Sequence, residues 1–247
     1  NIIFDFSFYR KNFFSNHNYW NKGCIWYKKH FQRAKEALIG EASTSYTCCP
    51  IIPNVPQRIY ESIPQVKLIY ILRDPIERLK SHYLHRVNRG FENRHINDII
   101  NNYENESLYW QGLYNYQLEQ YLEYFYKDNI HLMLNEELKS NPLETMESAF
   151  SFLGVSSYFS DAEYTSQHNA NKKVTMKSSF GMTVSRFYRR NLEQRAIPYR
   201  LKKPFLQLAE IGAREINGAG MSTSAYEKLQ ELYTADVEQL QRTYGLN

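Results

Sequence analysis

The sequence has little cysteine and no long run of apolar residues. Three of its 247 residues are cysteine, too few for the disulfide framework of a small secreted domain, so a reduced intracellular protein is favoured. No group of Cys and His has the spacing of zinc ligands, and we expect no metal. The longest apolar stretch, at residues 68–72, is far too short to cross a bilayer. The chain also opens without a charged-then-apolar leader. Together these absences predict a cytoplasmic protein.

The composition is that of an ordinary globular protein. Apolar residues make up 43% of the chain and charged residues 23%, which excludes collagen-like, coiled-coil and disordered classes. A chain of 29.4 kDa without an internal repeat or a long Pro/Gly/Ser linker predicts a single domain over residues 1–247.

The net charge of +4 conceals a strong asymmetry. Residues 92–147 carry eleven Asp/Glu and three Lys/Arg, whereas residues 172–203 carry ten Lys/Arg and one Glu. A second basic segment, residues 67–94, carries seven Lys/Arg and three Asp/Glu. The two basic segments could converge on one anion, but charge alone favours two separate solvated faces.

One segment predicts a strand, a tight turn and a helix in succession. Residues 66–72 have the length and β-branched character of a buried strand. Asp74 is a preferred N-cap and Pro75 suits the first helical position, so a helix should begin here. Its apolar stripe is spaced for one helical face and consists of Ile76, Leu79, Tyr83 and Val87.

The rest of the chain alternates between strand-like and helix-like patterns. Short strands are expected at residues 4–8, 37–40 and 130–134, and helices at residues 56–62, 95–127, 141–154 and 222–245. Asn141 and Pro142 repeat the N-cap and first-turn signals of Asp74 and Pro75. Residues 155–204 are polar, basic and weakly periodic, which predicts a long loop with a short helix. This alternation indicates an α/β fold with a mainly parallel sheet.

Arg73 and Ser81 are the first candidates for a binding site. Ligands of parallel α/β sheets bind at the carboxyl ends of the strands, where Arg73 is expected. Its guanidinium can grip a phosphate bidentately, and the helix that begins at Asp74 adds partial positive charge. Ser81 lies two turns along this helix, away from the apolar stripe. The pair could hold one phosphate, although an Arg-Asp-Pro turn is common and a helical Ser is usually only solvated.

The segment KLIYILRDPIERLKSHYLH resembles the 3′-phosphate-binding strand and helix of sulfotransferases that use 3′-phosphoadenosine 5′-phosphosulfate (PAPS). Further segments resemble the heparan sulfate type and its bacterial relatives in the same order: IGEASTSY, VPQRIYESIP, LNEELKSNPLETMESAFSFLGV and AYEKLQELYTADVEQLQRTYG. The resemblance covers roughly residues 1–60, 64–90, 130–155 and 222–245. It implies a three-layer α/β domain like that of P-loop NTPases, with a central, mainly parallel sheet flanked by helices.

The resemblance also implies roles for particular residues. Arg73 and Ser81 would bind the 3′-phosphate of PAPS and of its product, adenosine 3′,5′-bisphosphate (PAP), without a metal. Lys172 and Lys173 would contact phosphate from a lid over the nucleotide, with Lys177 as a third cation. The family has a Lys-Gly-Arg-like pattern there and this chain has Asn-Lys-Lys-Val; without the resemblance, a Lys pair in a polar loop is usually solvated.

The N-terminus departs from the family. No Gly-rich donor loop of the type G-x-x-x-x-G-K-[ST] occurs in the sequence. NIIFD resembles the end of a Lys-Glu-x-His-Phe-Phe-Asp-like segment, which places the expected catalytic Glu and the donor loop before Asn1. Asp5, His17 and Glu41 are the remaining candidates near the acceptor. His17 is either a base or a hydrated loop residue, and Glu41 either orients a side chain or forms a surface salt bridge.

The leading hypothesis is therefore in-line transfer of a sulfuryl group from PAPS to a hydroxyl or amine. The acceptor would belong to a small molecule, a saccharide or a hydroxyacyl chain on a carrier protein. One alternative is a non-catalytic module of the same fold that binds nucleotides or polyanions, which the missing donor loop and the basic segment would fit. A nucleotide kinase would need a Walker loop and Mg²⁺ ligands, and neither is visible. Nucleic acid is not an expected partner because the basic residues form no known recognition motif.

Overall fold

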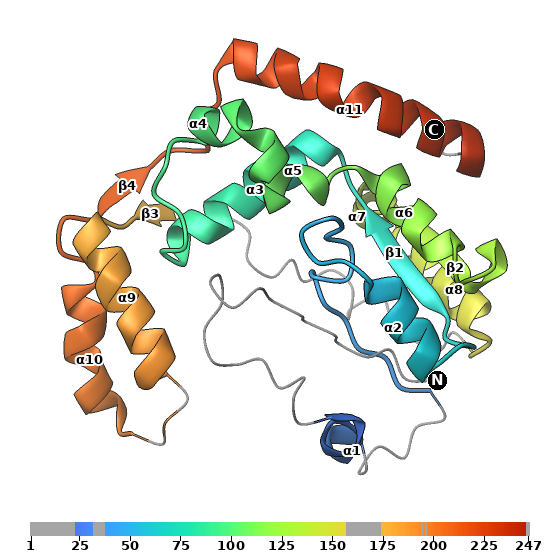
Figure 1. The fold of residues 1–247 in the computed structure, drawn as a ribbon, viewed down its shortest axis with the longest axis horizontal. Coiled ribbons are helices and arrows are strands. Elements are labelled where there is room, and N and C mark those ends of the chain that lie inside the picture. The colour runs from blue at the N-terminus through green and yellow to red at the C-terminus, as the bar shows by residue number, and fades with distance from the viewer. Residues whose placement is uncertain (1–22, 32–37, 157–173, 194, 196, 246–247) are drawn as a thin grey trace.

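Two parallel strands form the centre of the domain. The computed structural model describes residues 23–31, 38–156, 174–193, 195 and 197–245. Strand β1 (Leu68–Leu72) pairs in parallel with β2 (Ile130–Leu134), with Leu68 opposite Ile130 and Leu72 opposite Leu134. Helices cover this pair, as a parallel connection requires (Figure 1).

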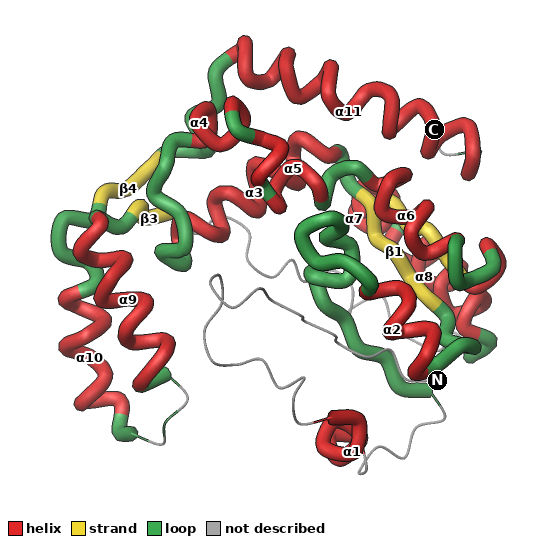
Figure 2. The backbone as a smooth tube through the Cα atoms, viewed as in Figure 1, coloured by secondary structure: helices red, strands yellow, loops and turns green. Residues whose placement is uncertain are grey.

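Helix is the dominant structure of the described residues (Figure 2). The α-helices are α1 (Gly23–Lys28), α2 (Val55–Ser62), α3 (Pro75–Asn88), α4 (Ile96–Asn101), α5 (Ser107–Trp110), α6 (Tyr114–Leu122), α7 (Asn135–Ser140), α8 (Pro142–Leu153), α9 (Ser179–Asn191), α10 (Tyr199–Leu208) and α11 (Thr223–Tyr244). Within the described ranges, three 3-10 turns are η2 (Lys29–Phe31), η3 (Tyr103–Asn105) and η4 (Lys127–Asn129). A second, antiparallel ribbon consists of β3 (Val174–Met176) and β4 (Arg214–Ile216).

The predicted strand, turn and helix are confirmed as β1 and α3. The Asp74 side chain accepts a hydrogen bond from the backbone N–H of Glu77 at 2.7 Å, and Pro75 begins the helix. The predicted apolar stripe of α3 is buried throughout. The sequence therefore directs β1 into the sheet and turns the chain sharply at Arg73.

Helix α11 connects two hydrophobic clusters. Leu229 and Tyr233 pack in the cluster with α3 and α4, and Leu240 packs in the cluster around the two parallel strands. The Tyr233 hydroxyl donates to the carbonyl of Tyr109 at 3.1 Å. Gly112 permits this approach, because a Cβ atom there would lie 2.7 Å from that hydroxyl oxygen. The C-terminal helix is thus part of the core.

Several other predicted elements are confirmed. The strand at 130–134 and the helices at 56–62, 141–154 and 222–245 appear with nearly the predicted bounds. The last two end where expected, because Gly154 and Gly245 adopt left-handed backbone conformations with φ of 77° and 64°. The acidic helical region 95–127 is divided into α4, η3, α5 and α6.

Three predictions were wrong. Of the strand predicted at residues 37–40, the described residues 38–40 are irregular, and they pair with no strand of the described chain. Asn141 precedes α8 but its side chain makes no capping hydrogen bond. Residues 174–208 are mainly helical rather than loop, because Ser178 caps α9, and α9 and α10 pack against each other as a hairpin. The strand predicted at 4–8 lies outside the described residues.

The structure also bears on membrane insertion. Among the described residues, no helix combines the length and the apolar character that a bilayer crossing requires.

Candidate functional site

A cavity of about 810 Å³ lies beside the turn between β1 and α3. One wall comes from α3 and the turn before it, and the opposite wall comes from residues 218–223 and Tyr226 at the start of α11. A volume of this size suits a small-molecule ligand. Because Arg73 follows the last residue of β1, the cavity opens at the carboxyl end of a parallel strand, where α/β proteins bind ligands.

Arg73 and Ser81 both line this cavity. The structure therefore brings together the two residues that the sequence analysis proposed for one phosphate. The Arg73 side chain is 32% exposed, and Ser81 is exposed on α3. Both groups are accessible to a ligand that enters the cavity.

Two further charged residues of the cavity were not predicted. Lys80 Nζ lies 2.7 Å from a carboxylate oxygen of Glu77, and the Arg73 guanidinium lies 4.0 Å from the other oxygen. Lys80 Nζ also lies 5.3 Å from the centre of the Tyr226 ring. The cavity therefore holds two cations with one carboxylate between them, and an incoming anion would compete with Glu77 for both.

The opposite wall is a glycine-containing loop that leads into a long helix. Gly218 and Gly220 have φ values of 70° and 67°, which L side chains rarely adopt. Ser222 then caps the 22-residue α11 by accepting from the N–H of Ala225 at 3.2 Å. The first N–H groups of a helix carry partial positive charge, so this wall adds to the positive potential of Arg73 and Lys80.

The helical spacing of Glu77, Lys80 and Ser81 could have suggested the first wall, because these residues lie within about one turn of one another on one flank of α3, beside its apolar stripe. The second wall lies about 140 residues further along the chain. No local pattern pairs residues 218–226 with Arg73, so only the packing of α11 against α3 reveals it.

The other predicted site residues are placed differently. Asp5, His17, Lys172 and Lys173 lie outside the described residues, so their proposed roles stay predictions. Glu41 accepts a hydrogen bond from the Tyr46 hydroxyl and lines neither of the two cavities described here. Its proposed role near the acceptor stays a prediction.

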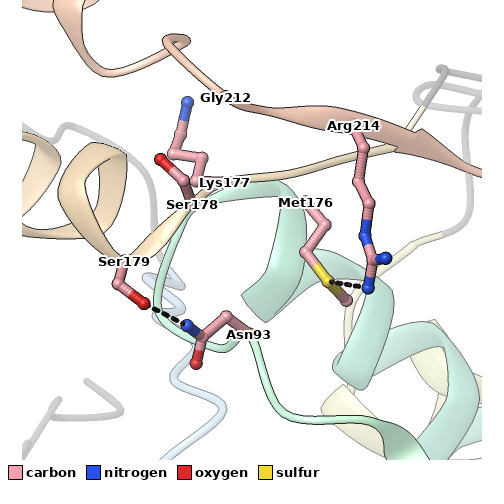
Figure 3. Close-up of a pocket in the computed structure, with 7 residues that line it drawn as sticks. All are labelled: Asn93, Met176, Lys177, Ser178, Ser179, Gly212 and Arg214. Carbon is pink, nitrogen blue, oxygen red and sulfur yellow. Dashed lines mark hydrogen bonds between the residues drawn. The ribbon is translucent and has the colours of Figure 1, made fainter.

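Lys177 lies at a second, smaller cavity of about 210 Å³ (Figure 3). Its ammonium group pairs with Glu210, and the neighbouring Arg214 donates to the sulfur of Met176 at 3.5 Å. Asn93 donates to the Ser179 hydroxyl at 3.4 Å on the same wall. The residues of this cavity are distinct from those of the Arg73 cavity, so the structure does not bring Lys177 to Arg73 and Ser81.

Behind the cavity, α3 carries a layer of partly buried polar residues. Burial, followed by the charges of Arg78, Arg86 and His85, lowers the pKa of His82 to about 3. Burial also raises the pKa of the Cys48 thiol to about 11. Cys48 and Cys49 are both free thiols. At neutral pH His82 is thus uncharged and Cys48 protonated, which suits structural rather than nucleophilic roles.

The lowered pKa of His82 predicts a loss of stability in mild acid. At a pH below about 6.5, the pKa of a histidine in the unfolded chain, the His82 imidazole binds a proton in the unfolded chain but not in the folded protein. Acid therefore favours unfolding. Because His82 is only half-buried, we expect wild type to lose about 1 kcal/mol between pH 7 and pH 5 from this group. Urea denaturation of wild type and His82→Gln at both pH values measures the difference. An equal pH dependence in the two proteins would contradict the assignment.

The fold and the cavity define an α/β domain that presents cations and a hydroxyl at the carboxyl end of a parallel strand. Residues 51–198 match the sulfotransferase domain family, and this chain belongs to that family. A solved sulfotransferase from Alicyclobacillus acidocaldarius has a similar fold: it aligns with a TM-score of 0.64 and 20% identity, over 97% of this chain and 80% of its own.

Two curated human relatives are heparan sulfate enzymes. Human bifunctional heparan sulfate N-deacetylase/N-sulfotransferase 2 is 28% identical over 162 residues, which are 59% of this chain and 18% of the relative. Human heparan sulfate glucosamine 3-O-sulfotransferase 5 is 29% identical over 159 residues, 58% of this chain and 44% of the relative. This chain therefore spans less than half the length of either relative. The predicted resemblance to this family is confirmed, as is the α/β class of the fold.

Proposed function

We propose that this chain transfers the sulfuryl group of PAPS to a hydroxyl or amine acceptor. The observation that carries the proposal is the shared cavity of Arg73 and Ser81. These two residues come from the segment that resembles the family's 3′-phosphate site, and they line one space next to Lys80.

The residues of the cavity fit the 3′-phosphate of the nucleotide. Arg73 offers a bidentate donor, Lys80 a point charge and Ser81 a hydroxyl donor. Charge-assisted contacts of this kind favour a bisphosphate over a nucleotide that has only a 5′-phosphate. In this assignment Glu77 serves as the counter-charge of both cations when no nucleotide is bound, since its carboxylate lies near each of them.

The donor, when bound, supplies the sulfuryl group, whose bond to the bridging phosphate oxygen breaks as the acceptor atom binds to sulfur. The described residues contribute by fixing the nucleotide in one orientation, which is a large part of catalysis by proximity. Arg73 and Lys80 also place positive charge near the nucleotide. The proton acceptor stays a prediction: it is the Glu that the resemblance implies before Asn1, with His17, Glu41 and Asp5 as the candidates within this sequence.

A saccharide is the favoured acceptor. The relatives' names assign heparan sulfate to them, with transfer to nitrogen in one and to oxygen in the other. A small molecule or a hydroxyacyl chain on a carrier protein is a further acceptor class. Incubation with a radiolabelled donor, followed by separation of labelled saccharide from labelled carrier, distinguishes them.

Calorimetric titration with PAP and with 5′-AMP tests the nucleotide site. We expect clearly tighter binding of PAP, because only PAP carries the phosphate that Arg73 and Ser81 contact. Equal affinities would remove the basis of the proposal. Tight PAP binding without transfer to any acceptor would instead favour the non-catalytic module of the same fold.

Replacement of Ser81 by alanine should have a smaller effect than loss of a charge. The lost hydroxyl contact should weaken PAP binding by about 1 kcal/mol, or about fivefold, and should leave 5′-AMP binding unchanged. Ser140→Ala is a matched control, because Ser140 is exposed on α7 and bonds only to helix carbonyls in the structure. An equal loss for both nucleotides in Ser81→Ala would place Ser81 away from the 3′-phosphate.

A further inference from the structure

The helical hairpin formed by α9 and α10 has an exposed apolar face. Phe187 of α9 stacks on Phe205 of α10 with ring centroids 5.9 Å apart. Phe180 lies two turns before Phe187 on the same side of α9, and Leu201 and Leu208 flank Phe205 on α10. The exposed fractions are high for apolar side chains: 55% for Phe180, 52% for Phe187, 64% for Leu201 and 42% for Leu208. These five residues are called the hairpin face below.

Positive charge surrounds the hairpin face. Residues 179–208 contain seven Lys/Arg and one Glu. Arg186 and Arg190 are exposed one turn apart on α9, and Arg200 and Lys203 are exposed on α10. The hairpin is thus amphipathic: aromatic and aliphatic side chains lie on one side, and cations lie along its border.

The base of the hairpin is fixed to the domain. Ser178 donates to the carbonyl of Ile211 at 2.7 Å, and the Arg189 guanidinium lies 4.0 Å from the Phe91 ring centre. Gly181 allows α9 to meet the end of α10, because a Cβ atom there would lie 2.3 Å from the carbonyl oxygen of Ala209. The two helices are therefore held as a unit that stands apart from α2, α6 and α8 (Figure 1).

We propose that the hairpin face docks this domain on the surface of an anionic phospholipid membrane. Interfacial helices carry Lys and Arg on the polar side and Phe or Leu on the other, and they insert only the apolar side among the headgroups. Anionic headgroups attract each nearby Lys or Arg. The hairpin face presents both features together.

Two other partners fit these observations less well. A protein interface also combines an apolar centre with a polar rim, but the charges of this hairpin are almost all of one sign, which matches anionic headgroups. A polyanionic saccharide would use the cations but leave four exposed apolar side chains without a partner. The distribution of acidic residues agrees with an orientation of the hairpin toward lipid. Residues 114–153, which contain α6 and α8, carry seven Asp/Glu and two Lys/Arg. These two helices lie at the end of the molecule opposite the hairpin, so their negative charge would face away from an anionic membrane (Figure 1).

Co-sedimentation of the full chain with vesicles tests the proposal. We expect binding to vesicles of phosphatidylcholine with phosphatidylglycerol, and much weaker binding to pure phosphatidylcholine. Phe180→Ser/Leu201→Ser should lower the partition coefficient at least about tenfold, because both side chains would insert. Arg186→Gln/Arg190→Gln should lower it by at least about the same factor through lost attraction to the headgroups.

Lys139→Gln/Arg242→Gln is the matched charge control, since both residues are exposed and distant from the hairpin in the sequence. It should bind vesicles like wild type. Unchanged circular dichroism and PAP binding in all variants would separate docking from folding and from the nucleotide site. Equal binding to both kinds of vesicle, or no loss in the apolar variant, would overturn the proposal. A loss confined to the arginine variant, with heparin as an effective competitor, would assign the surface to a polyanion instead.

Discussion

Replacing Arg73 by alanine is expected to weaken PAP binding about 30-fold, which corresponds to about 2 kcal/mol. Arg73 lies at the end of β1 and lines the cavity together with Ser81. The neutral side chain cannot replace the two hydrogen bonds and the charge that a guanidinium offers a phosphate. Binding of 5′-AMP should change much less. Calorimetric titration of both nucleotides into wild type and variant measures this difference.

The chain contains a matched control for this substitution. Arg242 of α11 pairs with Glu238 at 3.7 Å, and the two residues are four positions apart, as Arg73 and Glu77 are. Loss of an exposed pair of this type has little effect on stability, so Arg242→Ala should retain PAP affinity within about twofold. Unaltered PAP affinity in Arg73→Ala would contradict the phosphate assignment, and an equal loss in Arg242→Ala would indicate a non-specific charge effect.

Replacing Glu92 by alanine is expected to destabilise the fold by about 3 kcal/mol, because it removes the carboxylate that lies 3.9 Å from the buried Arg86 guanidinium. Glu92 is 4% exposed, lies 3.9 Å from Arg86 Nη2 and accepts from Arg94 Nη2 at 2.6 Å. Arg94 also donates to the buried Glu106 at 2.7 Å. The network joins the end of α3 to the helices that follow, so its loss should loosen this junction. Urea denaturation measures the free energy of unfolding.

The pH dependence of this effect gives a second measurement. Burial alone would raise the pKa of the Glu92 carboxyl, but hydrogen bonds from Arg94 and the charges of Arg94 and Arg86 lower it overall. The pKa of the Glu92 carboxyl is therefore lower in the folded than in the unfolded protein. The ionised carboxylate stabilises the fold at a pH above its unfolded-state pKa, and this stabilisation disappears as the pH falls through its folded-state pKa. The difference in the free energy of unfolding between wild type and Glu92→Ala should therefore become smaller in acid. Glu144→Ala, an exposed substitution on α8, should change stability by less than about 0.5 kcal/mol. A small, pH-independent loss in Glu92→Ala would show that Arg86 does not depend on Glu92.

The sequence was informative where the signals are local. The apolar stretch at β1, the N-cap Asp74 and the first-turn Pro75 each act within a few residues, and together they place Arg73 at a strand end. The same holds for Gly154 and Gly245, whose backbone conformations end α8 and α11. The helical character of residues 179–208 was missed, because its apolar residues are largely exposed and its many cations obscure the periodicity.

The sequence by itself determined the elements, the family and the two residues proposed for the 3′-phosphate. The elements follow from short-range physics, such as hydrophobic periodicity, capping and the steric limits of proline and glycine. The family and the two site residues follow from short sequence motifs that occur along the chain in the same order as in the family. Only the tertiary structure decided what stands opposite Arg73 and Ser81. The wall of residues 218–226, the contact of Lys80 with Tyr226 and the exposure of the hairpin face depend on how distant helices pack, and packing depends on contacts between residues far apart along the chain.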